Sequence, residues 1–76
     1  FYCTRQQIIE GAAGDLISLI PISEVVSGIK TTGLMYPLQD ETLFRWKTRG
    51  ISNQMQDQKA LIEYESGVLL CVHTFD

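Results

Sequence analysis

Two residues near the C-terminus, Cys71 and His73, are of types that could do chemistry at their spacing. A cysteine beside a histidine base is the arrangement of an activated nucleophilic thiol. On a β-strand, residues two apart point to the same face, but they lie about 7 Å from each other. That separation is too long for a direct hydrogen bond. We therefore interpret the pair as a buried thiol and an imidazole at the end of a strand.

Glu63 and Glu65 form a second candidate pair, of the kind that works as a general acid and base. Charged side chains on an exposed strand also discourage edge-to-edge association, and we favour that interpretation. His73 is the single histidine, and Cys3 and Cys71 are far apart in sequence, so no zinc-ligand spacing exists. A P-loop, a dinucleotide fingerprint and a nucleophile elbow are missing as well. The sequence predicts no enzyme, no metal site and no cofactor.

The charge of the chain bears on its partners. A net charge of −3 and a pI of about 4.9 argue against nucleic acid and against an anionic membrane surface. Only residues 39–60 are locally basic, with four basic side chains against three acidic ones. No stretch approaches the roughly 18 apolar residues of a membrane span. No signal peptide is visible, and two cysteines make no disulfide framework, so we expect a cytoplasmic protein with free thiols.

The elements that must position these residues are predicted to be helices over the first two thirds of the chain. A helix from Thr4 to Ile20 is indicated by apolar residues at helical spacing. A second helix is expected from Ser23 to Gly33, because a serine can cap it and a glycine can end it, although its β-branched residues also suit a strand. A third helix is expected from Asp40 to Gly50, with acidic residues in its first turn and basic residues in its last. A strand is the rival interpretation of this third segment, because residues 43–48 also alternate. The stripe of the first helix consists of Ile8, Ile9, Ala12, Ala13, Leu16, Ile17 and Ile20.

After residue 59 the apolar pattern changes to a period of two. Ala60–Tyr64 and Val68–Phe75 are predicted strands, and Ser66–Gly67 is a suitable tight turn between them. We therefore predict an α+β fold, a single domain over residues 1–76 with two or three N-terminal helices packed on a C-terminal β-hairpin. The facing pairs set by this turn are Tyr64 with Leu69, Ile62 with Cys71, and Ala60 with His73.

The stretch Thr42–Ile51 mixes basic and aromatic residues and reads TLFRWKTRGI. A hydroxyl residue, an apolar pair, Arg-Trp and a basic run ending in glycine resemble the recognition helix of excisionase-type and MerR-type helix-turn-helix proteins. The resemblance implies a winged-helix DNA-binding protein that uses the helix Asp40–Arg49, with the C-terminal hairpin as its wing. It places Arg45, Lys47 and Arg49 against DNA.

Two hypotheses for function follow, and the acidic charge favours the first. The first is a non-catalytic protein-interaction or regulatory module, such as a regulator, an inhibitor or an assembly subunit. Its partner is another protein or a second copy of the chain, because the apolar connector around Pro37 must lie on the core or on a partner. The second is the DNA-binding protein just described. The residues predicted to contact a protein partner are Leu34, Met35, Tyr36, Leu38 and Trp46.

Overall fold

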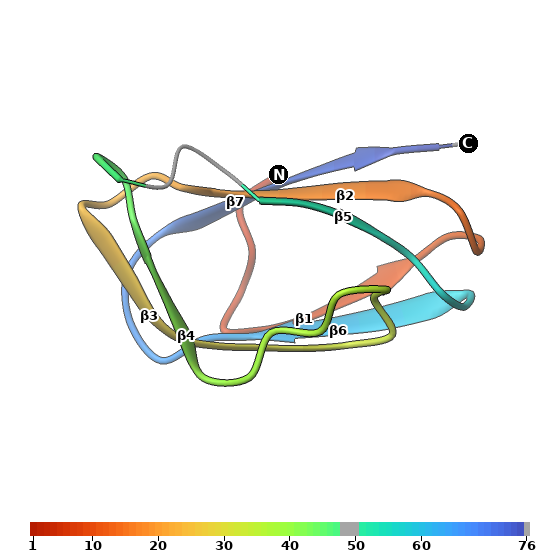
Figure 1. Ribbon diagram of the computed structural model, residues 1–76, viewed down its shortest axis with the longest axis horizontal. Helices are drawn as coiled ribbons and strands as arrows, with labels where there is room; N and C mark the ends of the chain where they lie inside the picture. Colours follow the sequence, from red (N-terminus) through yellow and green to blue (C-terminus); the bar gives the residue numbers. More distant parts are fainter. Residues whose placement is uncertain (48–50, 76) are drawn as a thin grey trace.

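The computed structural model describes residues 1–47 and 51–75, which form two packed β-sheets (Figure 1). One sheet has the strand order β1-β6-β3-β4 and the other the order β5-β2-β7, and all the pairings are antiparallel. The described residues contain no helix, so the predicted α+β fold is wrong. The strands are β1 (Gln6–Glu10), β2 (Leu16–Pro21), β3 (Val25–Thr32), β4 (Glu41–Phe44), β5 (Ile51–Gln54), β6 (Lys59–Glu63) and β7 (Leu69–Thr74).

The segment predicted to be the first helix contains β1 and β2, which belong to opposite sheets. Its isoleucines are β-branched and favour strands. In β2 every second side chain points inward, and Ile17 and Leu19 are completely buried. Between the strands the backbone turns, with Gly14 at a φ of 98° and the Asp15 N–H donating to the Ala12 carbonyl at 3.0 Å. The helical spacing therefore arises from apolar residues on both faces of two strands, since Ile8 and Leu16 are exposed whereas Ile9 and Ile17 are buried.

The segments predicted to be the second and third helices contain β3 and β4. A bulge between Val26 and Ile29, with Gly28 at a φ of 68°, shifts the register of β3. The bulge lets the start of β3 pair with β4 and its end with β6. Within residues 40–50, the strand interpretation is correct for Glu41–Phe44, which form β4. Residues 45–47 form a turn, so neither the helix nor the strand continues through them.

The two strands predicted at the C-terminus exist as β6 and β7, but they do not form a hairpin. β6 lies between β1 and β3, whereas β7 pairs with β2 in the other sheet. The connection between them is held on β3 and on the residues just before it, because Ser66 bridges to Ser27 in β3 and the Val68 N–H donates to Oγ of Ser23 at 2.9 Å. The predicted inward faces are confirmed, since Ile62 and Cys71 are both completely buried. They face the core from opposite sheets, so the predicted register is wrong.

The core lies between the two layers and receives side chains from every strand. Within the described residues, no helix is long and apolar enough to cross a membrane. The buried apolar residues are Cys3, Ile9, Ile17, Leu19, Val26, Ile29, Leu34, Leu43, Met55, Ala60, Ile62, Leu69 and Cys71.

Truncation of one isoleucine tests this assignment of inward and outward faces. Ile17 is 0% exposed in β2, whereas Ile8 in β1 is 61% exposed. Ile17→Ala should lower the free energy of unfolding by about 2–5 kcal/mol, because it removes buried methyl groups and leaves a cavity. Ile8→Ala should change it by less than about 0.5 kcal/mol. Urea denaturation of both variants measures the difference, and equal losses would contradict the two-layer assignment.

Candidate functional site

The segment that joins β3 to β4 is fastened to both sheets. On one side, the Met35 N–H donates to the Gln54 carbonyl at the end of β5 at 2.8 Å. On the other side, Oγ1 of Thr31 in β3 accepts the Leu38 N–H at 2.8 Å, and the Thr31 N–H donates to the Leu38 carbonyl at 2.9 Å. Residues 33–38 therefore leave the four-stranded sheet after β3, contact the end of β5 in the other sheet, and return to β3 before β4 begins.

The side chain of Asn53 holds the middle of this segment at Tyr36. Its Oδ1 accepts the Tyr36 N–H at 3.0 Å and the Gln54 N–H at 2.9 Å. Its Nδ2 donates to the Tyr36 carbonyl at 2.7 Å. Asn53 is only 3% exposed, and a buried amide without such partners would be costly. The hydrogen bonds fix the backbone of Tyr36 while its aromatic side chain remains 65% exposed.

A hollow of about 160 Å³ lies beside Tyr36. Its wall combines an aromatic ring, an aliphatic side chain, a hydroxyl and two amides, and it contains neither a carboxylate nor a cation. A wall of this kind suits a planar ligand that stacks on the ring and hydrogen-bonds at its edge. The residues that line the hollow are Leu16, Tyr36, Ser52, Asn53 and Gln54.

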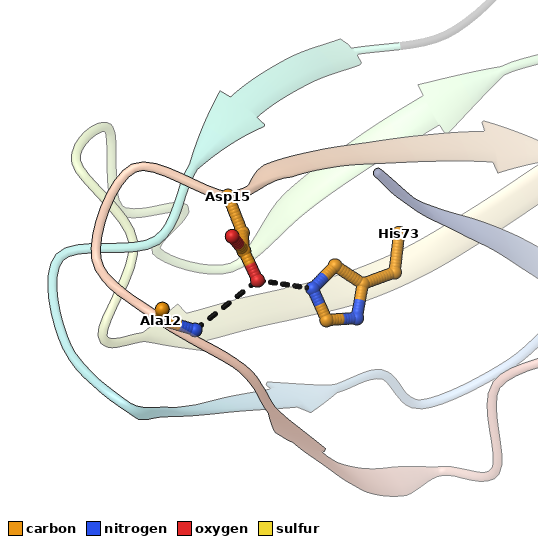
Figure 2. Close-up of polar contacts among 3 residues, drawn as sticks. All are labelled: Ala12, Asp15 and His73. Atoms are coloured by element: carbon orange, nitrogen blue, oxygen red, sulfur yellow. Dashed lines mark hydrogen bonds and ion pairs between the residues drawn. The ribbon is translucent and has the colours of Figure 1, made fainter. Parts of the chain in front are cut away.

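A second polar cluster is formed by Asp15, which directly precedes Leu16, together with Ala12 and His73. Nε2 of His73 lies 2.8 Å from Oδ2 of Asp15, and the same oxygen accepts the Ala12 N–H at 3.1 Å (Figure 2). Asp15 is buried, and a Cβ at Gly11 would lie 2.6 Å from this oxygen, so the cluster requires glycine there. The contacts attach the turn between β1 and β2 to β7 and thereby fix the start of β2.

The structure does not assemble the nucleophile pair suggested by Cys71 and His73. His73 is bound to Asp15, and Cys71 is completely buried beside Cys3. A side-chain hydrogen bond with Cys71, together with burial, raises the pKa of Cys3 well above its ordinary value. Both cysteines are free thiols, and the interpretation of Cys71 as a buried thiol is confirmed.

Glu63 and Glu65 lie at an open groove of about 670 Å³ on the outer face of the four-stranded sheet. Arg5 and Lys30 line the same groove, so cations stand among the two carboxylates. Glu63 pairs with Lys30 across the sheet, and the side chain of Glu65 covers Gly28. This is a charged surface exposed to solvent.

The five residues predicted to contact a protein partner are placed differently from one another. Leu34 is buried in the core and Leu38 is half-buried, so little of either is available at the surface. Met35 and Tyr36 are exposed in the connector, and Trp46 is exposed in the turn after β4. A role of these residues in binding a protein stays a prediction.

The predicted recognition helix does not form in the described part of the chain. Asp40, its expected cap, has a left-handed φ of 58°, and the strand β4 follows it. Arg45 and Lys47 lie in a turn, where Nη1 of Arg45 donates to the Ile22 carbonyl at 3.2 Å. Arg49 lies outside the described residues.

Sequence reasoning missed Ser52 and Asn53. The polar, amide-rich composition of residues 52–58 predicts a loop or a frayed helical extension, whereas β5 covers Ile51–Gln54. Asn53 occupies an inward position two residues before the buried Met55. A test for alternation starting at residue 51 would have indicated a strand with a polar residue on its inner face.

A protein-family model described as "Thiamin pyrophosphokinase, vitamin B1 binding domain" matches residues 5–69. This range contains every residue that lines the hollow. The chain belongs to this family. Both hypotheses drawn from the sequence, the protein-interaction or regulatory module and the DNA-binding protein, are therefore wrong.

Solved structures of thiamin pyrophosphokinases have the same fold as this member of the family. The enzyme from Geobacillus thermodenitrificans is 28% identical with a TM-score of 0.85, and the match covers 93% of this chain and 34% of that chain. The enzyme from Bacillus subtilis is 26% identical with a TM-score of 0.84, covering 99% and 36%. The chain thus spans about a third of the length of these kinases. None of the curated proteins compared with the chain matches it.

Loss of the Asp15 carboxylate tests whether the cluster in Figure 2 holds the β1–β2 turn. Asp15→Ala should lower the free energy of unfolding by about 1–3 kcal/mol, because the Ala12 N–H and the largely buried side chain of His73 lose their partner. Asp57→Ala is the matched control, since Asp57 is exposed and, among the residues that the structure describes, its side chain accepts only the neighbouring Gln58 N–H. Urea denaturation compares the two, and a similar small change in both would show that the cluster does not stabilise the fold.

Proposed function

We propose that the chain binds thiamin, as the vitamin-binding part of a thiamin pyrophosphokinase. The observation that carries this proposal is the family match over residues 5–69, which includes the complete wall of the hollow. The proposal gives the chain a binding role. The phosphate donor and the chemical step are assigned to the parts of such kinases that this chain does not span.

The wall of the hollow suits the chemistry of thiamin. The vitamin consists of a flat aminopyrimidine ring joined to a thiazolium ring that carries a permanent positive charge. The exposed ring of Tyr36 offers a face for stacking and for attraction of a cation. The hydroxyl of Ser52 and the amide of Gln54 can hydrogen-bond the ring nitrogens and the amino group. The net charge of −3 also favours a cationic ligand.

The size of the hollow limits how much of the ligand this chain encloses. Ligand pockets usually measure about 300–1,000 Å³, whereas this hollow measures about 160 Å³. Tyr36 and its neighbours would therefore cover one side of the vitamin. The other side would be covered by a further part of the kinase or by a second subunit.

Removal of the Tyr36 ring tests the proposal directly. Tyr36→Ala should weaken thiamin binding about tenfold, because stacking and cation–π attraction to one ring contribute on the order of 1–2 kcal/mol. Tyr2→Ala is a matched control, since Tyr2 is also 65% exposed but lies beside Leu70 at the β7 edge, away from the hollow. Isothermal titration calorimetry with thiamin measures both.

Two results would contradict the proposed function. One is that the unmodified chain, folded and at millimolar thiamin, shows no binding. The other is that Tyr36→Ala and Tyr2→Ala bind with the affinity of the unmodified chain, which would move the site away from the hollow.

A further inference from the structure

We propose that Asn53 is a positioning residue, which supports ligand binding by holding the backbone of Tyr36 at the hollow. The inference rests on the proposed function, because its readout is the affinity for thiamin. It assigns to Asn53 a role that is exerted through Tyr36, without a hydrogen bond to the ligand.

The hydrogen bonds of Asn53 leave little capacity for a ligand. A side-chain amide has one oxygen that accepts about two hydrogen bonds and one nitrogen that donates two. Oδ1 already accepts from two backbone N–H groups, those of Tyr36 and Gln54. Nδ2 already donates to the Tyr36 carbonyl. At 3% exposure, Asn53 also presents almost no surface to the hollow that it helps to line.

The geometry requires an amide at this position. Tyr36 presents both its N–H and its carbonyl to residue 53, so the side chain there must accept and donate at the same time. Aspartate has nearly the same shape, but its ionised carboxylate would face the Tyr36 carbonyl without a proton to donate. Alanine would leave both backbone groups of Tyr36 without their partner.

Thr31 provides an internal comparison, because it holds the same segment by a similar contact. Its Oγ1 accepts the Leu38 N–H at 2.8 Å, and it is buried like Asn53. Neither Thr31 nor Leu38 lines the hollow. Thr31→Val therefore removes a buried hydrogen bond from the connector without touching the part that carries Tyr36.

The decisive experiment is a double-mutant cycle on thiamin affinity, measured by calorimetry on Asn53→Ala, Tyr36→Ala and the double variant. Asn53→Ala alone should weaken binding about as much as Tyr36→Ala, roughly tenfold. In the Tyr36→Ala background it should cause no further loss, because the ring it positions is already gone. The backbone groups of residue 36 persist in that background, so the stability cost of Asn53→Ala should be the same in both. Thr31→Val should lower stability but leave thiamin affinity unchanged.

The outcomes separate this inference from the proposed function. If Asn53→Ala weakens binding by the same factor in both backgrounds, Asn53 acts independently of Tyr36 and the inference is wrong. If Asn53→Ala keeps the thiamin affinity of the unmodified chain, the inference also fails, while thiamin binding itself stands. The same holds if Thr31→Val loses as much thiamin affinity as Asn53→Ala. If the unmodified chain does not bind thiamin, the proposed function fails. Should Asn53→Ala not fold, Asn53→Asp is interpreted in the same cycle, because it keeps the shape but replaces the donor with a charged acceptor.

Discussion

A polar side chain buried in an apolar core must satisfy its hydrogen bonds, and this requirement shapes the irregular parts of the molecule. Three polar residues are buried in the described chain: Asp15, Thr31 and Asn53. Each binds the backbone of a segment outside the sheets: Asp15 at Ala12, Thr31 at Leu38 and Asn53 at Tyr36. An unmade hydrogen bond at such a depth costs about 1–3 kcal/mol, so these contacts specify the paths of the connecting segments.

The topology explains why such contacts are needed in so short a chain. The strands β1 and β2 lie in different sheets, as do β6 and β7, so the chain repeatedly crosses between layers. A crossing segment cannot use the hydrogen-bond ladder of a sheet, and its backbone groups need other partners. Side chains from the core supply some of them. The connector of residues 33–38, which leaves the four-stranded sheet after β3 and returns to it at β4, combines backbone bonds to β5 with bonds to the side chains of Asn53 and Thr31. The shape of the hollow is consequently set by the same residues that close the sandwich.

The sequence predicted the local features of the C-terminal strands but not the fold. Alternation identified β6 and β7, and it placed Ile62 and Cys71 correctly on inner faces. It failed for the N-terminal third because apolar residues on two strands, separated by a turn at Gly14, also match a helical period. The hairpin register failed for a different reason. A tight turn is a local signal, whereas the connection from β6 to β7 contacts Ser27 of β3 and Ser23 just before it, about 40 residues earlier in the chain.

The candidate site shows the same division between local and distant information. From the sequence, Tyr36 was recognised as an aromatic residue in an apolar connector and was predicted to contact a protein partner. Asn53 lies in a polar stretch, and nothing near it in sequence indicates that its amide binds a backbone 17 residues away. Neither residue alone forms a binding site, because an exposed ring on an unrestrained loop would lose much of its contact energy on becoming ordered. In the proposed site, a buried amide holds the backbone of Tyr36 in advance and reduces that loss, so the proposed site depends on both residues and forms where β5 and the connector meet.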